Sequence, residues 1–164
     1  APALEDYEYD AMLRELEEDL KLPLRIRDDE NGKPYLSGSK LHFSLSHSGP
    51  FVACAVSDRP VGVDIQKRGP CRASILRRCM TDDEQAFILS SPDPESAFIR
   101  IWTGKESYGK ALGIGLQIPL REVSVLQLPG EAALWHRASP EFQISLCTLS
   151  GKADPDSVRE IRLP

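Results

Sequence analysis

Hydrophobic positions recur along this chain with two different periods. Strict alternation, or an unbroken short apolar run, predicts β-strands over 24–27, 41–46, 51–57, 61–66, 123–128, 132–138 and 142–149. Apolar residues spaced three and four apart predict helices over 6–22, 74–79, 81–89 and 94–112. Because strands are followed by helices and then by strands again, the pattern favours an α+β fold with an antiparallel sheet.

The helix boundaries carry their own signals. Thr81-Asp82-Asp83-Glu84 has the form of a capping box, in which the threonine hydroxyl and the glutamate carboxylate satisfy the first turn. Asp93-Pro94 places a capping residue before a proline at the first helical position. Gly113 is a stop signal, since a helix end often needs a residue at positive φ. The sequence therefore predicts one long helix from Pro94 to Leu112.

Composition narrows the function classes. The 164 residues are 41% apolar, enough for a core of one or two small domains, and the net charge of −5 gives no support for nucleic-acid binding. No apolar run reaches the length of a membrane span, and no secretory signal pattern opens the chain. Four cysteines show no metal-binding spacing. We expect a cytoplasmic protein without a membrane or nucleic-acid partner.

Two stretches carry candidate chemistry. Glu106 and Lys110 are four apart on the long helix and so share one face, a spacing that is also typical of an ordinary surface salt bridge. In the strand 61–66, Asp64 interrupts a strongly β-forming run and shares a face with Gly62 and Gln66. Asp64 could bind a nearby backbone group at a strand end or act as a metal ligand, with Gly62 leaving room for the ligand.

Together these stretches resemble the 4′-phosphopantetheinyl transferases, in their surfactin-synthetase-activating branch. The matching segments are Gly32-Lys33-Pro34, Phe43-Ser44-Leu45-Ser46-His47-Ser48-Gly49, Gly62-Val63-Asp64-Ile65-Gln66, Trp102-Thr103-Gly104-Lys105-Glu106-Ser107-Tyr108-Gly109-Lys110 and Gly113-Ile114-Gly115-Leu116-Gln117-Ile118-Pro119-Leu120. Each motif alone is weak, but five in the family's order, over roughly residues 32 to 149, make a strong signal.

The resemblance implies a fold and a reaction. The family fold packs a long helix on an antiparallel sheet, and large members are pseudo-dimers of two similar halves. Here the halves would be residues 1–57, which is short for a first half, and 58–164. The implied enzyme is of the holo-(acyl-carrier-protein) synthase type. It would transfer phosphopantetheine from coenzyme A to a serine of an acyl or peptidyl carrier protein, with Mg²⁺, releasing 3′,5′-ADP.

The resemblance also implies roles for single residues. Asp64, Gln66 and Glu106 correspond to metal ligands, although many relatives have glutamate in place of Gln66. Glu106, as ligand or general base, and Lys110, as a cation beside the phosphates, are the catalytic candidates. Lys33, Ser46, His47 and Lys110 are candidates for binding coenzyme A, with a solvated turn lysine as the alternative for Lys33. His42 and His136 match no motif and are interpreted as structural.

Two questions stay open at the level of sequence. Four arginines in an otherwise acidic chain are either a docking patch for an acidic carrier protein or a solvated face: Arg68, Arg72, Arg77 and Arg78. The second question is turnover. Gln66 and the short first half favour a non-catalytic module that binds coenzyme A or a carrier protein, whereas the intact Asp64, Glu106 and Lys110 favour an enzyme.

Overall fold

The computed structural model describes residues 14, 17–18, 26–28 and 34–151. Most of the helix predicted over 6–22 therefore lies outside the described residues, although residues 14, 17 and 18 are helical. Lys33 and the first two positions of the strand predicted over 24–27 also lie outside them.

Within the described residues the strands form three antiparallel sheets, where the sequence predicted a single antiparallel sheet in an α+β fold. A short pair joins β1 (Ile26–Asp28) to β2 (Pro34–Leu36), and a hairpin joins β3 (His42–Ser48) to β4 (Phe51–Ser57). The third sheet has the order β5-β7-β6, with bounds Val61–Lys67, Phe142–Thr148 and Ala133–Ala138. In this sheet β7 is central, so β5 has one edge that is not paired with another strand of the sheet.

Three α-helices lie between β5 and β6: α2 (Ala73–Cys79), α3 (Asp82–Ser90) and α4 (Pro94–Leu112), followed by the 3₁₀-helix η1 (Gly115–Gln117). The predicted caps are confirmed. Thr81 and Glu84 form the capping box of α3, and the Asp93 side chain accepts from Ser96 N–H at the start of α4. Gly113 ends α4 at φ 78°, a left-handed conformation that glycine adopts without cost.

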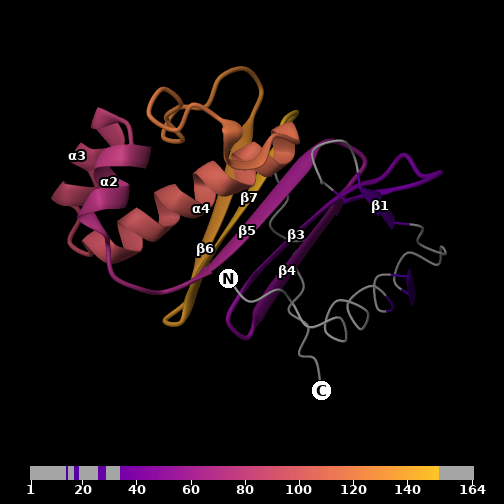
Figure 1. The fold of residues 1–164 in the computed structure, drawn as a ribbon, viewed down its shortest axis with the longest axis horizontal. Coiled ribbons are helices and arrows are strands. Elements are labelled where there is room, and N and C mark those ends of the chain that lie inside the picture. Colours follow the sequence, from indigo (N-terminus) through magenta and orange to yellow (C-terminus); the bar gives the residue numbers. More distant parts are fainter. Residues whose placement is uncertain (1–13, 15–16, 19–25, 29–33, 152–164) are drawn as a thin grey trace.

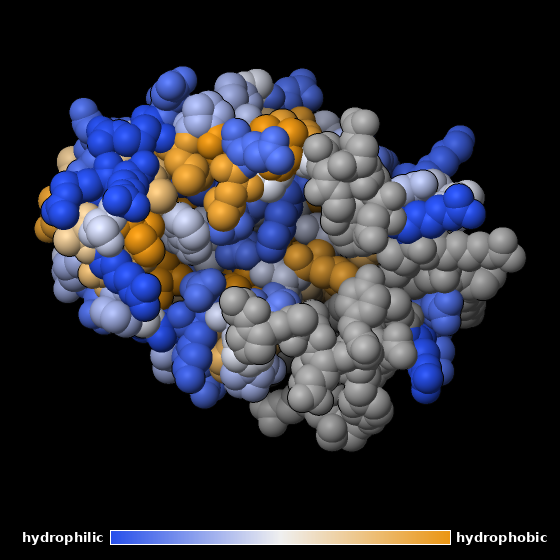
Figure 2. Space-filling model, in the orientation of Figure 1, coloured by the Kyte–Doolittle hydropathy of each residue, from blue (hydrophilic) through white to orange (hydrophobic). Residues whose placement is uncertain are grey.

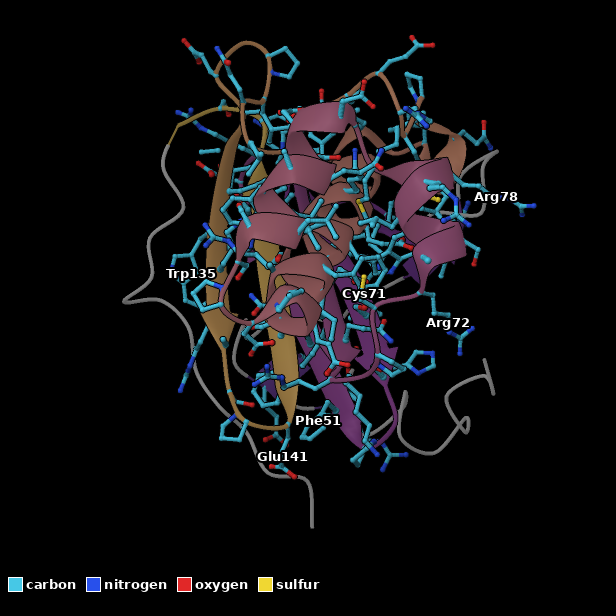
Figure 3. The ribbon with its side chains drawn as sticks, turned by 90° about the vertical axis from the view of Figure 1, so that its left-hand side faces the viewer. Phe51, Cys71, Arg72, Arg78, Trp135 and Glu141 are labelled. Carbon is cyan, nitrogen blue, oxygen red and sulfur yellow. The ribbon has the colours of Figure 1, made fainter. Side chains whose placement is uncertain are left out.

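The β5-β7-β6 sheet is covered on both faces. Helix α4 lies across one face (Figure 1), where Tyr108 and Ala111 pack with Cys147 of β7. The hairpin covers the other face, where Ala53 of β4 packs with Val63 and with further apolar residues of β5 and β7. Phe51, near Glu141 in Figure 3, packs against Phe142 with the ring centroids 4.9 Å apart and the ring planes tilted by 50°. The hairpin and the sheet thus share one core.

Gly62 makes the contact between β5 and α4 possible. A Cβ at this position would lie 2.0 Å from the backbone oxygen of Ser107 and 2.4 Å from the backbone nitrogen of Ala111. The space at Gly62 is therefore filled by the backbone of α4, and the interpretation that it admits a ligand is wrong. The close approach still serves the site, because it brings the next strand residue on the same face, Asp64, against the helix.

The strand predicted over 123–128 is wrong. This segment is a loop of turns and bends, although Val125 is buried as the alternation required. Its backbone groups bond to side chains instead of a neighbouring strand: Val125 N–H donates to Glu84 and Val123 C=O accepts from Lys105. Glu84 and Lys105 are themselves fully buried and paired, with 2.8 Å between Nζ and Oε2.

The predicted division into halves, 1–57 and 58–164, stays a prediction. The hairpin β3–β4 lies before that boundary and the β5-β7-β6 sheet after it, and the two are packed together. Within the described residues no helix is long and apolar enough to cross a bilayer.

Candidate functional site

Asp64 and Lys110 meet where β5 passes under the end of α4. The alternation of β5 turns Asp64 toward the helix, and α4 brings Lys110 to the free edge of the strand. Lys110 Nζ lies 2.8 Å from Asp64 Oδ1 and 3.1 Å from the carbonyl oxygen of Val63. Asp64 is buried and Lys110 is half-buried, so this pair is not an ordinary solvated surface salt bridge.

The two oxygens of the Asp64 carboxylate have different surroundings. Oδ1 accepts from the Ser46 hydroxyl at 2.7 Å as well as from Lys110. Oδ2 is buried and has no hydrogen-bond partner in the described part of the chain. Burial raises the pKa of Asp64 above its ordinary value, against the lowering effects of Lys110 and Ser46. A buried carboxylate oxygen without a donor is costly, and a cation at that position would remove the cost.

Glu106 is the second carboxylate of the site. It lies one turn before Lys110 on α4 and is half-buried. Burial, with the Asp64 carboxylate as the next cause, raises the pKa of Glu106 to about 7, although Lys110 opposes the shift. Asp64 and Glu106 both lie beside Lys110, Asp64 through its ion pair and Glu106 one turn earlier on the same helix.

Gln66 lies two residues beyond Asp64 on the face that β5 turns to α4, as predicted, and it is half-buried. Among the described residues, no group of three or more His, Cys, Asp and Glu side chains converges on a point. The metal ligands predicted from the sequence, Asp64, Glu106 and Gln66, therefore stay a prediction, with two carboxylates and one neutral amide among the described residues.

The residues predicted to bind coenzyme A are not gathered at one place in the described structure. Lys33 lies outside the described residues, and Lys110 is at the site. Ser46 is buried with its hydroxyl directed to Asp64, on the hairpin face that packs against the sheet. His47 alternates with Ser46 on β3 and so extends from the opposite face of the hairpin, half-buried. A role for His47 toward coenzyme A stays a prediction.

The structural interpretation of His136 agrees with its surroundings. Its Nδ1 lies 2.7 Å from the hydroxyl of Ser145, which is itself 2.6 Å from the hydroxyl of Thr103. Thr103 in turn donates to the carbonyl of Ile99, so the polar atoms of this buried chain are satisfied across β6, β7 and α4. Burial lowers the pKa of His136 to about 4, helped by Arg100, which keeps the ring neutral at physiological pH.

The four arginines of the predicted patch differ in their partners. Arg68 is ion-paired with Asp93. Arg72, Arg77 and Arg78 are exposed on or before α2, and within the described residues none of the three has an ion pair. Figure 3 shows Arg72 and Arg78 extending outward on the same side of the molecule. The predicted patch of four arginines is thus reduced to three whose positive charge has no ion-pair partner among the described residues.

Sequence comparison identifies the class of protein. The family model of the 4′-phosphopantetheinyl transferase superfamily matches residues 60–159. A 4′-phosphopantetheinyl transferase of Bacillus subtilis is 34% identical over 143 residues, covering 77% of this chain and 62% of the relative. The transferase Sfp of Bacillus subtilis strain 168 is 30% identical over 159 residues, covering 87% and 69%. The transferase gsp of Aneurinibacillus migulanus is 38% identical over 97 residues, covering 58% and 40%.

The chain belongs to the 4′-phosphopantetheinyl transferase superfamily, and its similarity to these Bacillus enzymes places it in the Sfp-like branch. It spans between 40% and 69% of the length of these three relatives. A solved holo-(acyl-carrier-protein) synthase from Bacillus anthracis, in complex with coenzyme A (3′,5′-ADP), is 17% identical with a TM-score of 0.48, covering 56% of this chain and 96% of that one.

Proposed function

We propose that this chain transfers the 4′-phosphopantetheine group of coenzyme A to a serine of an acyl or peptidyl carrier protein, with Mg²⁺, and releases 3′,5′-ADP. The observation that carries the proposal is the ion pair of Asp64 with Lys110, one turn from Glu106 on α4, in a chain of this superfamily. The relatives are named 4′-phosphopantetheinyl transferases, and Asp64, Glu106 and Lys110 have the charges that such a transfer would use.

The residues present fit a magnesium ion. Mg²⁺ is a hard cation that is usually bound through one or two carboxylates, with phosphate oxygens and waters completing its octahedron. Among the described residues, Asp64 Oδ2 is a buried oxygen without a donor, and Glu106 is a second carboxylate whose ionisation is disfavoured by burial and then by the charge of Asp64. When bound, the ion would neutralise the pyrophosphate of coenzyme A and stabilise the charge that develops on the leaving group.

The chain's own groups account for the rest of the chemistry. The carrier serine forms a new P–O bond at the β-phosphorus, the bond to the bridging oxygen breaks, and 3′,5′-ADP departs. Lys110 presents a cation beside Asp64, where it can balance phosphate charge. Glu106 has the ionisable group to accept the serine proton, directly or through water, but a bound cation would lower its pKa and make it only a modest base. Metal ligation and proton acceptance both use its ionised form.

Mass spectrometry tests the proposal directly. The protein is incubated with coenzyme A, Mg²⁺ and an apo carrier protein, and the carrier is weighed. A mass increase by one phosphopantetheine group on the serine is expected, and EDTA should prevent it. Binding of coenzyme A without any adduct would instead establish the non-catalytic alternative. A wild-type protein that neither modifies a carrier nor binds coenzyme A would overturn both.

Replacing Gln66 by glutamate should lower the Mg²⁺ concentration needed for half-maximal transfer. Gln66 shares its strand face with Asp64, so a third carboxylate would add charge to the site. We expect a decrease of roughly tenfold, the lower end of what changes around a metal site produce. Magnesium titrations of the wild type and Gln66→Glu are the measurement. Gln143→Glu, opposite Gln66 on β7, is the control for a carboxylate added merely nearby. An unchanged titration would show that the side chain at 66 does not face the metal.

The exposed arginines predict a salt-dependent carrier contact. Figure 2 shows hydrophilic residues mixed with hydrophobic ones over α2 and α3, where Phe87 and Leu89 are exposed. Carrier proteins are typically acidic, so the arginines of this surface offer the complementary charge. Replacing Arg72 and Arg78 together by alanine should raise the KM for the carrier several-fold and flatten its dependence on ionic strength, because exposed charges act over a Debye length of about 8 Å. Turnover at saturating carrier should change little, since Asp64, Glu106 and Lys110 are untouched.

Arg137→Ala is the matched control for this pair. Arg137 is exposed on β6, the strand of Trp135, which Figure 3 shows on the side away from Arg72 and Arg78. Steady-state kinetics at several salt concentrations compare the variants. If the double variant and Arg137→Ala showed the same KM and the same salt dependence as the wild type, the arginines would be a solvated face and the carrier would dock elsewhere.

A further inference from the structure

Three serine hydroxyls join the hairpin to the edge of β5 that is not paired with another strand of its sheet. Ser44, Ser46 and Ser48 lie on the face of β3 that packs against the sheet. Their hydroxyl oxygens accept, in order, from the backbone N–H of Val63 at 3.0 Å, Ile65 at 3.2 Å and Lys67 at 2.9 Å. Side chains thus take the place that backbone carbonyls of another strand would occupy, and the edge is closed.

Ser46 differs from the other two serines. Its oxygen accepts from Ile65 N–H, and its single hydroxyl proton is donated to Asp64 Oδ1 at 2.7 Å. Both hydrogen-bonding directions of this hydroxyl are therefore fixed by neighbours, one on the backbone and one on the site carboxylate. Ser44 is also buried and accepts from the same strand, but among the described residues its side chain bonds to the backbone of Val63 and not to Asp64.

The bond from Ser46 decides which oxygen of Asp64 is left for a cation. Oδ1 receives two donors, Ser46 from the hairpin and Lys110 from α4. Oδ2 receives none among the described residues. Lys110 is a charged group on a flexible stem, whereas the Ser46 hydroxyl is short and held by the strand it bridges. Rotation of the carboxylate would break the Ser46 bond, so this contact fixes the orientation of Asp64.

We propose that Ser46 is a positioning residue, which orients the Asp64 carboxylate so that Oδ2 is presented to a divalent cation. This rests on the proposed function of the site. Outer hydrogen bonds of this kind set the direction and the charge of a metal ligand, and their loss typically weakens metal affinity by 10- to 100-fold. Ser46 precedes the residues that the family model matches, 60–159, so the hairpin contributes to the site from outside that region.

The ladder supplies its own matched control. Ser46→Ala and Ser44→Ala each remove one bond to the β5 backbone, but only Ser46→Ala removes a bond to Asp64. Binding of Mn²⁺ in the presence of coenzyme A is measured by electron paramagnetic resonance of the free ion, and melting temperatures are measured without metal. We expect similar melting temperatures for the two variants, with Mn²⁺ affinity about tenfold weaker in Ser46→Ala and within twofold of wild type in Ser44→Ala.

Ser46→Thr keeps the hydroxyl and should restore most of the Mn²⁺ affinity. Equal losses of affinity in Ser44→Ala and Ser46→Ala, or no loss in either, would overturn the role of Ser46 while leaving the proposed function standing. A wild-type protein that binds no Mn²⁺ with coenzyme A and modifies no carrier would overturn the proposed function and this role with it.

Discussion

Replacing Glu84 by glutamine is expected to lower the free energy of unfolding by about 3–5 kcal/mol, the usual cost of leaving one member of a buried ion pair alone. Glu84 and Lys105 are both fully buried, with 2.8 Å between their charged atoms. Glu84 also accepts from the N–H groups of Thr81 and Val125, so it ties the start of α3 to the loop after α4. In Glu84→Gln, the Lys105 ammonium keeps two carbonyl partners but loses its counter-charge.

Asp82→Asn is the control for this prediction, because it breaks an exposed pair on the same helix. Asp82 lies 2.9 Å from Arg121, and the two side chains are 93% and 50% exposed. Exposed pairs contribute about 0–1 kcal/mol, so this variant should be nearly as stable as the wild type. Urea unfolding of the three proteins is the measurement. Equal stabilities of Glu84→Gln and Asp82→Asn would show that burial does not set the value of the Glu84–Lys105 pair.

The same pair marks the limit of sequence-based prediction. The capping box was readable because Thr81 and Glu84 are three residues apart and act locally. The contacts of Glu84 with Lys105 and Val125 could not be predicted from the sequence, since these two residues come from elements far along the chain. Lys105 lies next to Glu106 in the family segment 102–110, yet α4 turns Lys105 into the core and leaves Glu106 half-buried beside Lys110. Adjacent helical positions face different ways, and periodicity alone does not say which side carries the chemistry.

The strand prediction for 123–128 is wrong for a related reason. Its apolar positions alternate, and Val125 is buried, so the pattern of burial was read correctly. A strand also needs a neighbouring strand to which its backbone can hydrogen-bond. Here the side chains of Glu84 and Lys105 bind the backbone groups of Val125 and Val123 instead. The strand predicted over 61–66 is confirmed because β7 supplies that neighbour on one side and the serine hydroxyls of β3 accept from its backbone N–H groups on the other.

Periodicity predicted which site residues share a face of each element, and the family resemblance predicted that the two elements meet. Alternation placed Asp64 and Gln66 on one face of a strand, and helical spacing placed Glu106 beside Lys110. Nothing in either period says that the strand lies under that helix; the family resemblance supplied this, and the contact at Gly62 shows how it is built. Neither the periodicity nor the family resemblance predicted the bond from Ser46 to Asp64, because it depends on how the hairpin meets the edge of β5.

Replacing Glu106 by glutamine is expected to reduce transfer by about 100-fold or more, a usual size for losing a charged group of the reacting site. The same variant should be more stable than the wild type at pH 8 when metal is absent. The folded protein raises the pKa of Glu106 from 4.5 to about 7, so it binds a proton more tightly than the unfolded chain does. The contribution of this group to stability is therefore greatest below about pH 4.5 and falls as the pH rises toward 7.

Glutamine cannot ionise, so the variant escapes this fall: its advantage should be small at pH 5 and clear at pH 8. Melting temperatures in EDTA at the two pH values measure it, together with the carrier-modification rate in Mg²⁺. Glu122→Gln removes an exposed carboxylate and should change neither result. Addition of Mg²⁺ and coenzyme A should reverse the order of stability, because only the wild type retains both carboxylates to hold the cation. A Glu106→Gln variant that lost stability at pH 8 would mark Glu106 as a structural residue, and one that kept wild-type transfer would remove it from the chemistry.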